Sequence, residues 1–408
     1  MVQKRSKVGD KYVKLDPVKH VIKRPDMYIG STEKDSYLTW IYDDEQSKMV
    51  KKDIKFVPGF YKIFDELIVN ILDHMKRIDM DNKNKNKNVV KNIKVNVDVS
   101  DNRIEVYNDG DGIDIDIHPE HDIYIPELIF GNMLTSTNYD ENEEKVIGGM
   151  NGIGAKACNI FSKKFIIETV DADKGLKYTQ QFENNMSKKN KPKIKEYKKY
   201  PYTKITFYPD FEKFNITKIS TNMFKLMQKR VYDICALTDD SIKVYFNNKK
   251  LNINNFQKYA QLYLEDYSNK DIIYEKVNDR WEVIATYNDQ TSNLEQISFV
   301  NGIWTIKGGK HVDNVVNQII KNMTELIVKS STVKRALNRN PASSILSLAP
   351  SQRSITAMIA STVAPNDFIV SAASRTCPPV VAISSTITTR SSFDNLPSNW
   401  LEVPYSFF

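Results

Sequence analysis

Four glycines within seven residues, followed at once by a helix-favouring run, constrain this chain more than any other feature. They lie in Ile-Gly-Gly-Met-Asn-Gly-Ile-Gly-Ala-Lys-Ala-Cys-Asn-Ile, residues 147–160. Glycine lets the backbone take positive φ and approach a ligand closely. A helix that starts directly afterwards turns its unpaired N–H groups toward the loop. The stretch therefore predicts a loop that can cradle phosphates, with Lys156 as a point charge.

Other interpretations of this stretch stay open at this point. Gly152-x-Gly154-x-x-Ala157 has the spacing of a dinucleotide fingerprint, but nothing strand-like precedes it. A P-loop requires Gly-Lys-Ser/Thr, whereas Ala155 separates Gly154 from Lys156 here. A flexible glycine turn without any ligand also fits, so other segments must decide.

The length, composition and net charge limit the class of protein. A chain of 408 residues with 41% hydrophobic residues and a mean hydropathy of -0.47 fits a globular protein of two or three domains. No apolar run of about 18 residues and no apolar signal core occur, so we expect no membrane-spanning helix. The three cysteines, Cys158, Cys235 and Cys377, are scattered, which favours a reducing compartment over a disulfide framework or zinc site. The net charge of +7 permits nucleic-acid binding without establishing it.

A strong amphipathic helix is predicted over residues 60–77. Its apolar residues keep i, i+3, i+4 spacing: Phe60, Ile63, Phe64, Leu67, Ile68, Ile71 and Leu72. Four polar residues form one stripe along its flank: Glu66, Asn70, Asp73 and His74. The stripe is either a solvated face or a site. In a site, the Glu66 carboxylate would polarise a water and the Asn70 amide oxygen would bind Mg2+.

Alternating apolar and polar residues predict two antiparallel strands, 93–99 and 103–107, joined near residues 100–102. The low-complexity stretch before them, 79–92, is predicted to be a solvated loop. The second strand runs into Asn108-Asp109-Gly110-Asp111-Gly112. A polar side chain at a strand end, followed by spaced glycines, can read the edge of a planar ligand. An ordinary Asp-Gly turn fits the same residues.

Three further segments are predicted from local signals. A helix covers residues 124–134 and is entered at Pro126. Ser136, Thr137 and Asn138 follow it, either as phosphate or ribose contacts or as loop solvation. The segment 25–30 is predicted to be short and extended between its proline and glycine. A last helix begins near Asp313 and has one apolar face.

Four patterns occur in one order: Glu66-x3-Asn70, Asn108-x-Gly110-x-Gly112, Ser136-Thr137-Asn138, and the glycine loop ending in Lys156. This order resembles the ATPase domain of the gyrase, chaperone, histidine-kinase and mismatch-repair (GHKL) superfamily. Longer segments resemble, more narrowly, the eukaryotic and viral type IIA DNA topoisomerases. These segments include Arg-Pro-Asp-Met-Tyr-Ile-Gly-Ser, residues 24–31, and Tyr-Ile-Pro-Glu-Leu-Ile-Phe-Gly, residues 124–131. The resemblance covers about residues 10–330.

The resemblance implies an α+β fold. Residues 1–250 would form the GHKL (Bergerat) ATPase sandwich, with a mixed β-sheet and helices on one face. Residues 251–332 would form part of an α/β transducer domain of the ribosomal-protein-S5-like type. Residues 333–408 would be an anomalous tail.

The resemblance also implies roles for single residues. Glu66 would be the general base that activates water, Asn70 would hold Mg2+, and Asn108 would read the adenine of ATP. Contacts to ribose and phosphates would come from Ser136, Thr137 and Asn138. The lid around the triphosphate would be formed by Gly149, Met150, Asn151, Gly152, Ile153, Gly154, Ala155 and Lys156.

Two departures from the family pattern bear on these roles. Met150 stands where the family usually carries an arginine that approaches the phosphates, so we expect weaker ATP binding or slower turnover. His74 replaces a usual asparagine near the phosphates.

The composition changes abruptly near residue 333. Residues 331–408 contain 15 serines, no glycine and a single lysine, Lys334. The transducer's Gln-Thr-Lys loop, whose lysine reaches the γ-phosphate in the family, does not occur there. A shifted reading frame, a disordered Ser/Pro-rich extension and a divergent transducer end are the three interpretations of the tail.

The resemblance thus implies the ATP-binding and ATP-hydrolysing gate of a DNA topoisomerase II. In the full enzyme, an isomerase, two such protomers would close as a homodimer and capture DNA, and this chain alone would be at most an ATPase. The alternatives are a non-catalytic nucleotide-binding fragment or a degenerate gene product, and a chaperone or mismatch-repair ATPase of the superfamily. The expected location is the nucleus, or a viral factory in the cytoplasm if the gene is viral.

Overall fold

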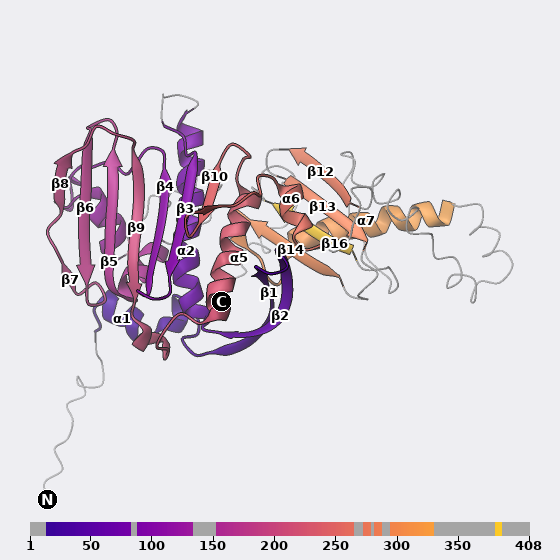
Figure 1. The fold of residues 1–408 in the computed structure, drawn as a ribbon, viewed down its shortest axis with the longest axis horizontal. Coiled ribbons are helices and arrows are strands. Elements are labelled where there is room, and N and C mark those ends of the chain that lie inside the picture. Colours follow the sequence, from indigo (N-terminus) through magenta and orange to yellow (C-terminus); the bar gives the residue numbers. More distant parts are fainter. Residues whose placement is uncertain are drawn as a thin grey trace, which may run out of the picture.

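The computed structural model describes residues 14–82, 88–133, 152–264, 272–278, 281–287, 294–329 and 380–385. Two sheets follow one another along the long axis of the molecule, and helix α5 (Thr221–Leu237) lies between them (Figure 1). Helices pack against sheets that are mainly antiparallel, so the fold is α+β, as predicted.

The larger sheet is mixed and has nine strands. Its order is β11-β10-β3-β4-β9-β5-β6-β7, and β8 also pairs with β6. Only β10 and β3 run parallel, whereas the other neighbouring pairs are antiparallel. The strands are β3 (Asn92–Asp98), β4 (Arg103–Asp109), β5 (Ser162–Asp171), β6 (Leu176–Glu183), β7 (Lys188–Lys189), β8 (Lys193–Glu196), β9 (Tyr202–Pro209), β10 (Lys243–Phe246) and β11 (Lys249–Lys250).

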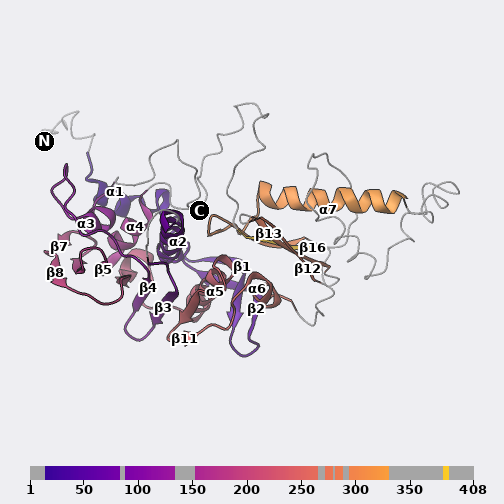
Figure 2. The same cartoon turned by 90° about the horizontal axis from the view of Figure 1, so that it is seen from above.

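Helices cover one face of this sheet (Figure 2). They are α1 (Pro17–Lys23), α2 (Pro58–Asn82), α3 (Ile125–Gly131) and α4 (Gly154–Ile160). The predicted alternation places every second residue of β3 in the core, and the predicted apolar positions of α2 are buried. Helix α2 continues to Asn82, so the loop predicted from residue 79 is wrong over its first residues; buried Ile78 keeps the last turns packed.

The sequence analysis missed a hairpin near the N-terminus. Strands β1 (Asp35–Asp43) and β2 (Lys48–Phe56) pair antiparallel and pack against α5. The segment predicted to be extended between Pro25 and Gly30 is instead a 3-10 turn, η2 (Pro25–Met27), because a proline at the first helical position also suits a helical turn. A second such turn is η3 (Phe211–Phe214).

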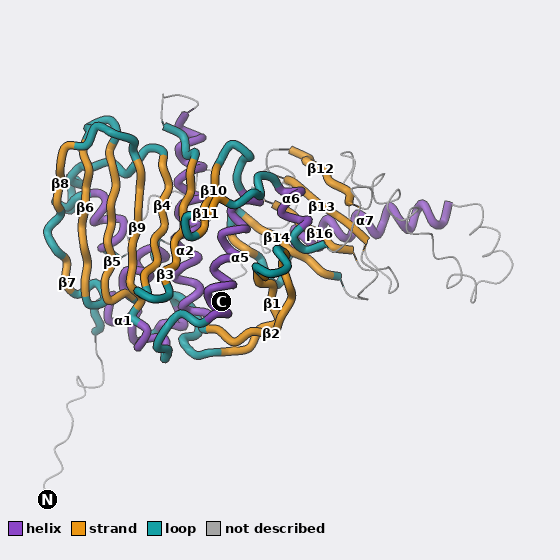
Figure 3. Tube along the Cα trace, in the orientation of Figure 1, coloured by secondary structure: helices purple, strands orange, loops and turns teal. Residues whose placement is uncertain are grey.

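The smaller sheet has the order β12-β13-β16-β14-β15. Its strands are β12 (Ile272–Asn278), β13 (Trp281–Tyr287), β14 (Glu295–Val300), β15 (Ile303–Trp304) and β16 (Val380–Ser385). Helix α6 (Phe256–Gln261) packs near β13, and α7 (Lys310–Lys329) extends away from the larger sheet (Figure 3). No helix among the described residues is long and apolar enough to span a membrane.

Candidate nucleotide site

One side of α2 carries the predicted polar stripe between two glycine loops. Glu66, Asn70 and His74 follow one another at intervals of four residues, so they lie on the same side of the helix. Glu66, at one end of this stripe, lies against Gly154, the first residue of α4. At the other end, His74 Nε2 lies 2.6 Å from Asp111 O, in the glycine loop after β4. Helix α2 therefore connects the two loops that the sequence analysis singled out.

The Glu66 carboxylate occupies space that only a glycine at position 154 leaves open. A Cβ atom built on Gly154 would lie 1.7 Å from Glu66 Oε2. The other carboxylate oxygen forms an ion pair with Lys62 Nζ at 2.6 Å, one turn earlier on α2. Burial lowers the pKa of Lys62, but the carboxylates of Glu66 and Asp65 outweigh it, and the pKa ends above its ordinary value. The carboxylate is therefore held at the start of α4 by a protonated lysine.

Three neighbouring strands contribute a polar row to one face of the larger sheet. Asn108 on β4 lies opposite Thr203 on β9, which lies opposite Thr169 on β5. The next row along the same face is apolar and consists of Val106, Ile205 and Ile167. Asn108 and Thr169 are buried, so this row interrupts an otherwise apolar face. Buried polar side chains of this kind need hydrogen-bond partners. Here Asn108 Nδ2 donates to Asp109 O at 3.0 Å, and the hydroxyl oxygens of Thr169 and Thr203 lie 3.0 Å apart.

The glycine loop after β4 is held tightly against β5. Ile113 N donates to Thr169 Oγ1 at 2.8 Å, and a Cβ atom on Gly112 would lie only 2.1 Å from Val170 O. Gly110 has a φ of 93°, which favours glycine. Asp109 has a structural role, because its carboxylate accepts from the backbone N–H groups of Lys91 and Asn92, each at 2.7 Å. Gly112 therefore allows the loop to approach the backbone of β5 closely, whereas Asn108 belongs to the polar row.

Lys156 is buried in the first turn of α4. Its Nζ donates to Gly152 O, which precedes Ile153 and the helix. Burial lowers the pKa of Lys156 to about 8. A lysine with this pKa is only partly protonated near pH 8, so a nearby anion would increase its protonation.

The structure brings many of the predicted residues together. Glu66, Asn70 and Asn108 lie as described, and Gly152, Ile153, Gly154, Ala155 and Lys156 form the start of α4. Six predicted residues lie outside the described residues: Ser136, Thr137, Asn138, Gly149, Met150 and Asn151. The sequence analysis missed Thr169 and Thr203. Their only sequence signal is a threonine within a strand that is otherwise apolar on that face.

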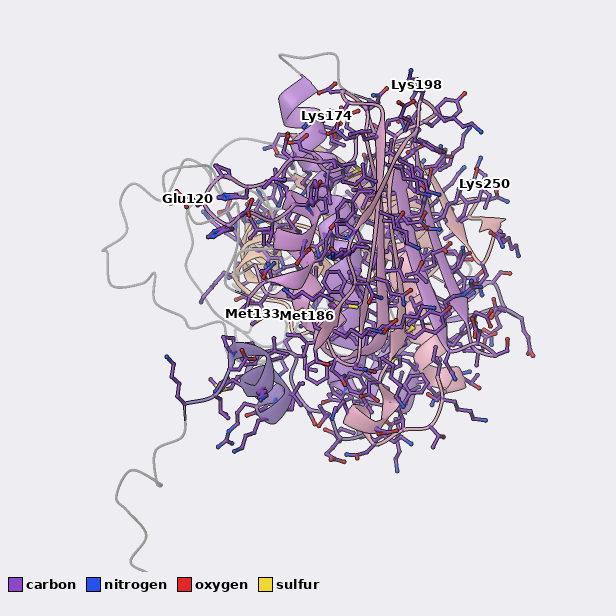
Figure 4. All side chains as sticks on the ribbon, turned by 90° about the vertical axis from the view of Figure 1, so that its left-hand side faces the viewer. Glu120, Met133, Lys174, Met186, Lys198 and Lys250 are labelled. Carbon is purple, nitrogen blue, oxygen red and sulfur yellow. The ribbon has the colours of Figure 1, made fainter. Side chains whose placement is uncertain are left out.

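Two other polar groups differ in chemistry from the predicted nucleotide site. His118, Glu120 and His121 bring ligand atoms within 4.8 Å of one another on the loop before α3, and their imidazoles suit zinc better than Mg2+. Glu120 lies on the side of the large sheet where the helices pack, away from Lys250 (Figure 4). A hollow beside the glycine loop is lined by Asp111, Gly112, Asp114, Asp171, Ala172 and Asp173, and its carboxylates would repel phosphates.

Comparisons with known proteins match both sheets. Residues 57–209 match the family of histidine kinase-, DNA gyrase B- and HSP90-like ATPases, and residues 242–347 match the DNA gyrase B family. DNA topoisomerase 2 of Saccharomyces cerevisiae is 46% identical over 338 residues, which are 79% of this chain and 23% of that protein. DNA topoisomerase 2 of Acanthamoeba polyphaga mimivirus is 46% identical over 331 residues, 79% of this chain and 25% of that protein.

A solved structure matches over almost the whole chain. The ATPase and transducer domains of DNA topoisomerase II from Balamuthia mandrillaris superpose with a TM-score of 0.73 at 32% identity. The match covers 93% of this chain and 85% of that one. This chain spans about a quarter of the length of these two curated relatives.

Proposed function

This chain belongs to the DNA topoisomerase II family, and on that basis we propose that it binds and hydrolyses ATP as the N-terminal gate of such an enzyme. The observation that carries the proposal is the position of Glu66. Its carboxylate lies against Gly154, at the start of the helix that follows the glycine loop, and pairs with Lys62 at 2.6 Å. A carboxylate held there is placed to accept a proton from a water molecule that attacks the terminal phosphate.

The remaining residues would bind and orient the nucleotide. Asn108, which shares the polar row with Thr203 and Thr169, would hydrogen-bond the adenine edge. The backbone from Gly152 to Ala155 and the Lys156 ammonium would contact the phosphates. We also assign Ser136, Thr137, Asn138, Gly149, Met150 and Asn151 to the ribose and phosphate contacts.

A divalent cation fits the same end of α2. Asn70 is half-buried one turn after Glu66, and its amide makes no hydrogen bond to any residue that the structure describes. An amide oxygen is a hard donor that suits Mg2+. Bound there, Mg2+ would neutralise charge on the phosphates, while Asn70 and Glu66 keep cation and base on one side of the helix.

The larger assembly is part of the same proposal. ATP would close two copies of this gate around a DNA segment, and hydrolysis would reopen them, within an enzyme that passes DNA strands through one another. The larger sheet and its helices, up to residue 250, would be the ATPase domain, and residues 251–332 would belong to the transducer. The gate would act in the nucleus, or in a viral factory in the cytoplasm if the gene is viral.

Steady-state turnover of Mg-ATP by residues 1–408, with nucleotide binding measured in parallel, tests this proposal. Saturable turnover that requires Mg2+ supports it. Binding without turnover would favour the second candidate, a nucleotide-holding fragment, for which Met150 in the lid is the specific reason. Absence of both would contradict the proposal.

Gly154→Ala should lower turnover without unfolding the protein. The new Cβ would displace the Glu66 carboxylate, which sits at the flexible end of its side chain and can move aside. We expect kcat to fall about 10- to 100-fold, because a misplaced base loses its near-attack geometry. Thermal unfolding should change little, since alanine is the better helix former. Unchanged kcat would show that the position of Glu66 is not needed.

ATP binding should be linked to protonation of Lys156. The pKa of Lys156 is lowered to about 8 by burial, and phosphates nearby would raise it. The complex would then hold more protons than the free protein, so affinity should fall as pH rises above about 8, and about half a proton should be taken up per ATP at pH 8.

Calorimetry in buffers of different ionisation enthalpy measures this uptake. It should vanish in Lys156→Met and persist in Lys163→Met, which removes an exposed lysine paired with Glu212. Uptake that persists in Lys156→Met would rule out Lys156 as its source.

A further inference from the structure

Arg230 of α5 lies in a buried charge cluster between the two sheets. Its side chain has no exposed surface. Arg230 Nε donates to Asp65 on α2, and its Nη2 donates to Gly302 O at 2.7 Å, in the turn between β14 and β15. One guanidinium therefore holds two elements that are far apart in sequence. Because Asp65 directly precedes Glu66, one of these elements is the turn of α2 that carries the proposed base.

The turn that Arg230 holds is itself seated on α2. Asn301 and Gly302 form the two-residue connection between Val300 and Ile303, and both have positive φ, at 49° and 81°. Such turns fix the register of a hairpin. A Cβ atom on Gly302 would lie 3.0 Å from Leu72 Cδ1, so the turn approaches α2 closely there as well. The smaller sheet thus meets the proposed catalytic helix at this turn.

The neighbouring residue offers a matched comparison. Lys229 is equally buried and pairs with Asp233 at 2.8 Å within α5. Its ammonium lies 3.3 Å from the centre of the Trp304 ring on β15. Lys229 therefore touches the smaller sheet, as Arg230 does, but its ion-pair partner lies on α5 rather than on α2. An effect specific to Arg230 must come through its bonds to Asp65 and to Gly302 O.

We propose that Arg230 is a positioning residue that clamps the Glu66 turn of α2 to the Asn301–Gly302 turn, so that hydrolysis depends on how the smaller sheet sits against α2. The clamp needs the forked guanidinium of arginine, whose separate N–H groups donate to Asp65 and to Gly302 O. A lysine has a single ammonium nitrogen and cannot donate to both acceptors with this geometry. The role assigned to Glu66 rests on the proposed function, whereas the clamp itself rests only on these contacts. Among the residues that the structure describes, Arg230 Nη1 has no hydrogen-bond partner. It lies 3.9 Å from Asp233 Oδ2, a second acceptor within reach of a small movement.

Arg230→Lys, with Lys229→Met as control, tests the clamp. Amide hydrogen exchange is measured on the nucleotide-free protein, together with kcat and KM for Mg-ATP. In Arg230→Lys, we expect faster exchange both in residues 62–70 of α2 and in residues 299–304. We also expect kcat to fall about 10- to 100-fold while KM stays near that of the wild type. In Lys229→Met, only residues 299–304 should exchange faster, and kcat should remain close to wild type.

The outcomes separate the clamp from the proposed function. Exchange in Arg230→Lys that rises only at residues 299–304 would overturn the clamp, as would a loss of kcat equal to that of Lys229→Met. A wild-type protein without turnover would contradict the proposed function, and the exchange data would still decide the clamp: faster exchange in both segments supports it, and unchanged exchange in α2 overturns it.

Discussion

Glu66→Gln is expected to lower ATP turnover by about 10²- to 10⁴-fold, the range of a lost general base, while ATP binding stays close to that of the wild type. Glutamine keeps the size of the side chain but cannot accept the proton of the attacking water. The side chain is paired with Lys62 and lies against Gly154, so the substitution changes charge with little change in packing. Turnover and equilibrium binding of ATP, measured on the same preparation, check the two parts of the prediction.

Glu212→Gln is the matched control for this substitution. Glu212 is an exposed residue of the 3-10 turn η3 and pairs with Lys163 at 3.0 Å, so Glu212→Gln removes the same charge at the surface. It should leave turnover unchanged. If Glu66→Gln turned over ATP as fast as Glu212→Gln, Glu66 would not be the base.

Gly112→Ala should destabilise the fold and abolish ATP binding. Its Cβ would lie 2.1 Å from Val170 O, a backbone atom of a central strand that cannot move without disturbing the sheet. Overpacking of a fixed core costs about 1–3 kcal/mol, and more where backbone must shift. The same shift would break the bond from Ile113 N to Thr169 Oγ1, in the polar row that contains Asn108. Urea unfolding and ATP titration of the variant measure both effects.

Gly175→Ala separates this clash from the ordinary cost of replacing a glycine. Gly175 has a φ of 61° in the turn between β5 and β6, but the nearest atom to its Cβ would be 3.6 Å away. Gly175→Ala should therefore lower the free energy of unfolding by only about 1 kcal/mol, the cost of placing a side chain in a left-handed conformation. The variant should still bind ATP. Equal loss of stability in both variants would contradict the role assigned to the close contact.

The sequence predicted helix α2 well because its signal is local. The apolar positions of α2 recur at helical spacing, and that spacing alone places Glu66, Asn70 and His74 on one side. The alternation in β3 and β4 likewise predicted a pair of strands ending near Asn108. The end of α2 was predicted less well, because a low-complexity composition does not show that buried Ile78 holds the last turns.

Contacts between distant segments could not be predicted. Thr169 and Thr203 join Asn108 only through the register of β4, β9 and β5, which no local pattern contains. Arg230 meets Asp65 across 165 residues, and its place in α5 does not differ in pattern from a solvated arginine. The β1–β2 hairpin was missed because its exposed and buried residues do not alternate strictly.

For most of the tail, residues 333–408, the three interpretations stay predictions. Residues 380–385 form β16, which pairs antiparallel with β13 and parallel with β14. The DNA gyrase B family match also continues to residue 347, beyond the boundary predicted at residue 332. Both observations favour a divergent transducer end over the other two interpretations, and the other residues of 333–408 lie outside the described part of the chain.

Equilibrium binding of a non-hydrolysable ATP analogue with Mg2+ to residues 1–408 tests the central claim most directly, because it does not depend on turnover. We expect one saturable site per chain that is weakened by Asn108→Ala, because we propose that Asn108 contacts the adenine. Binding should be unchanged by Lys250→Ala at the far sheet edge (β11). Absence of saturable binding, or binding that Asn108→Ala leaves unchanged, would contradict the site described here.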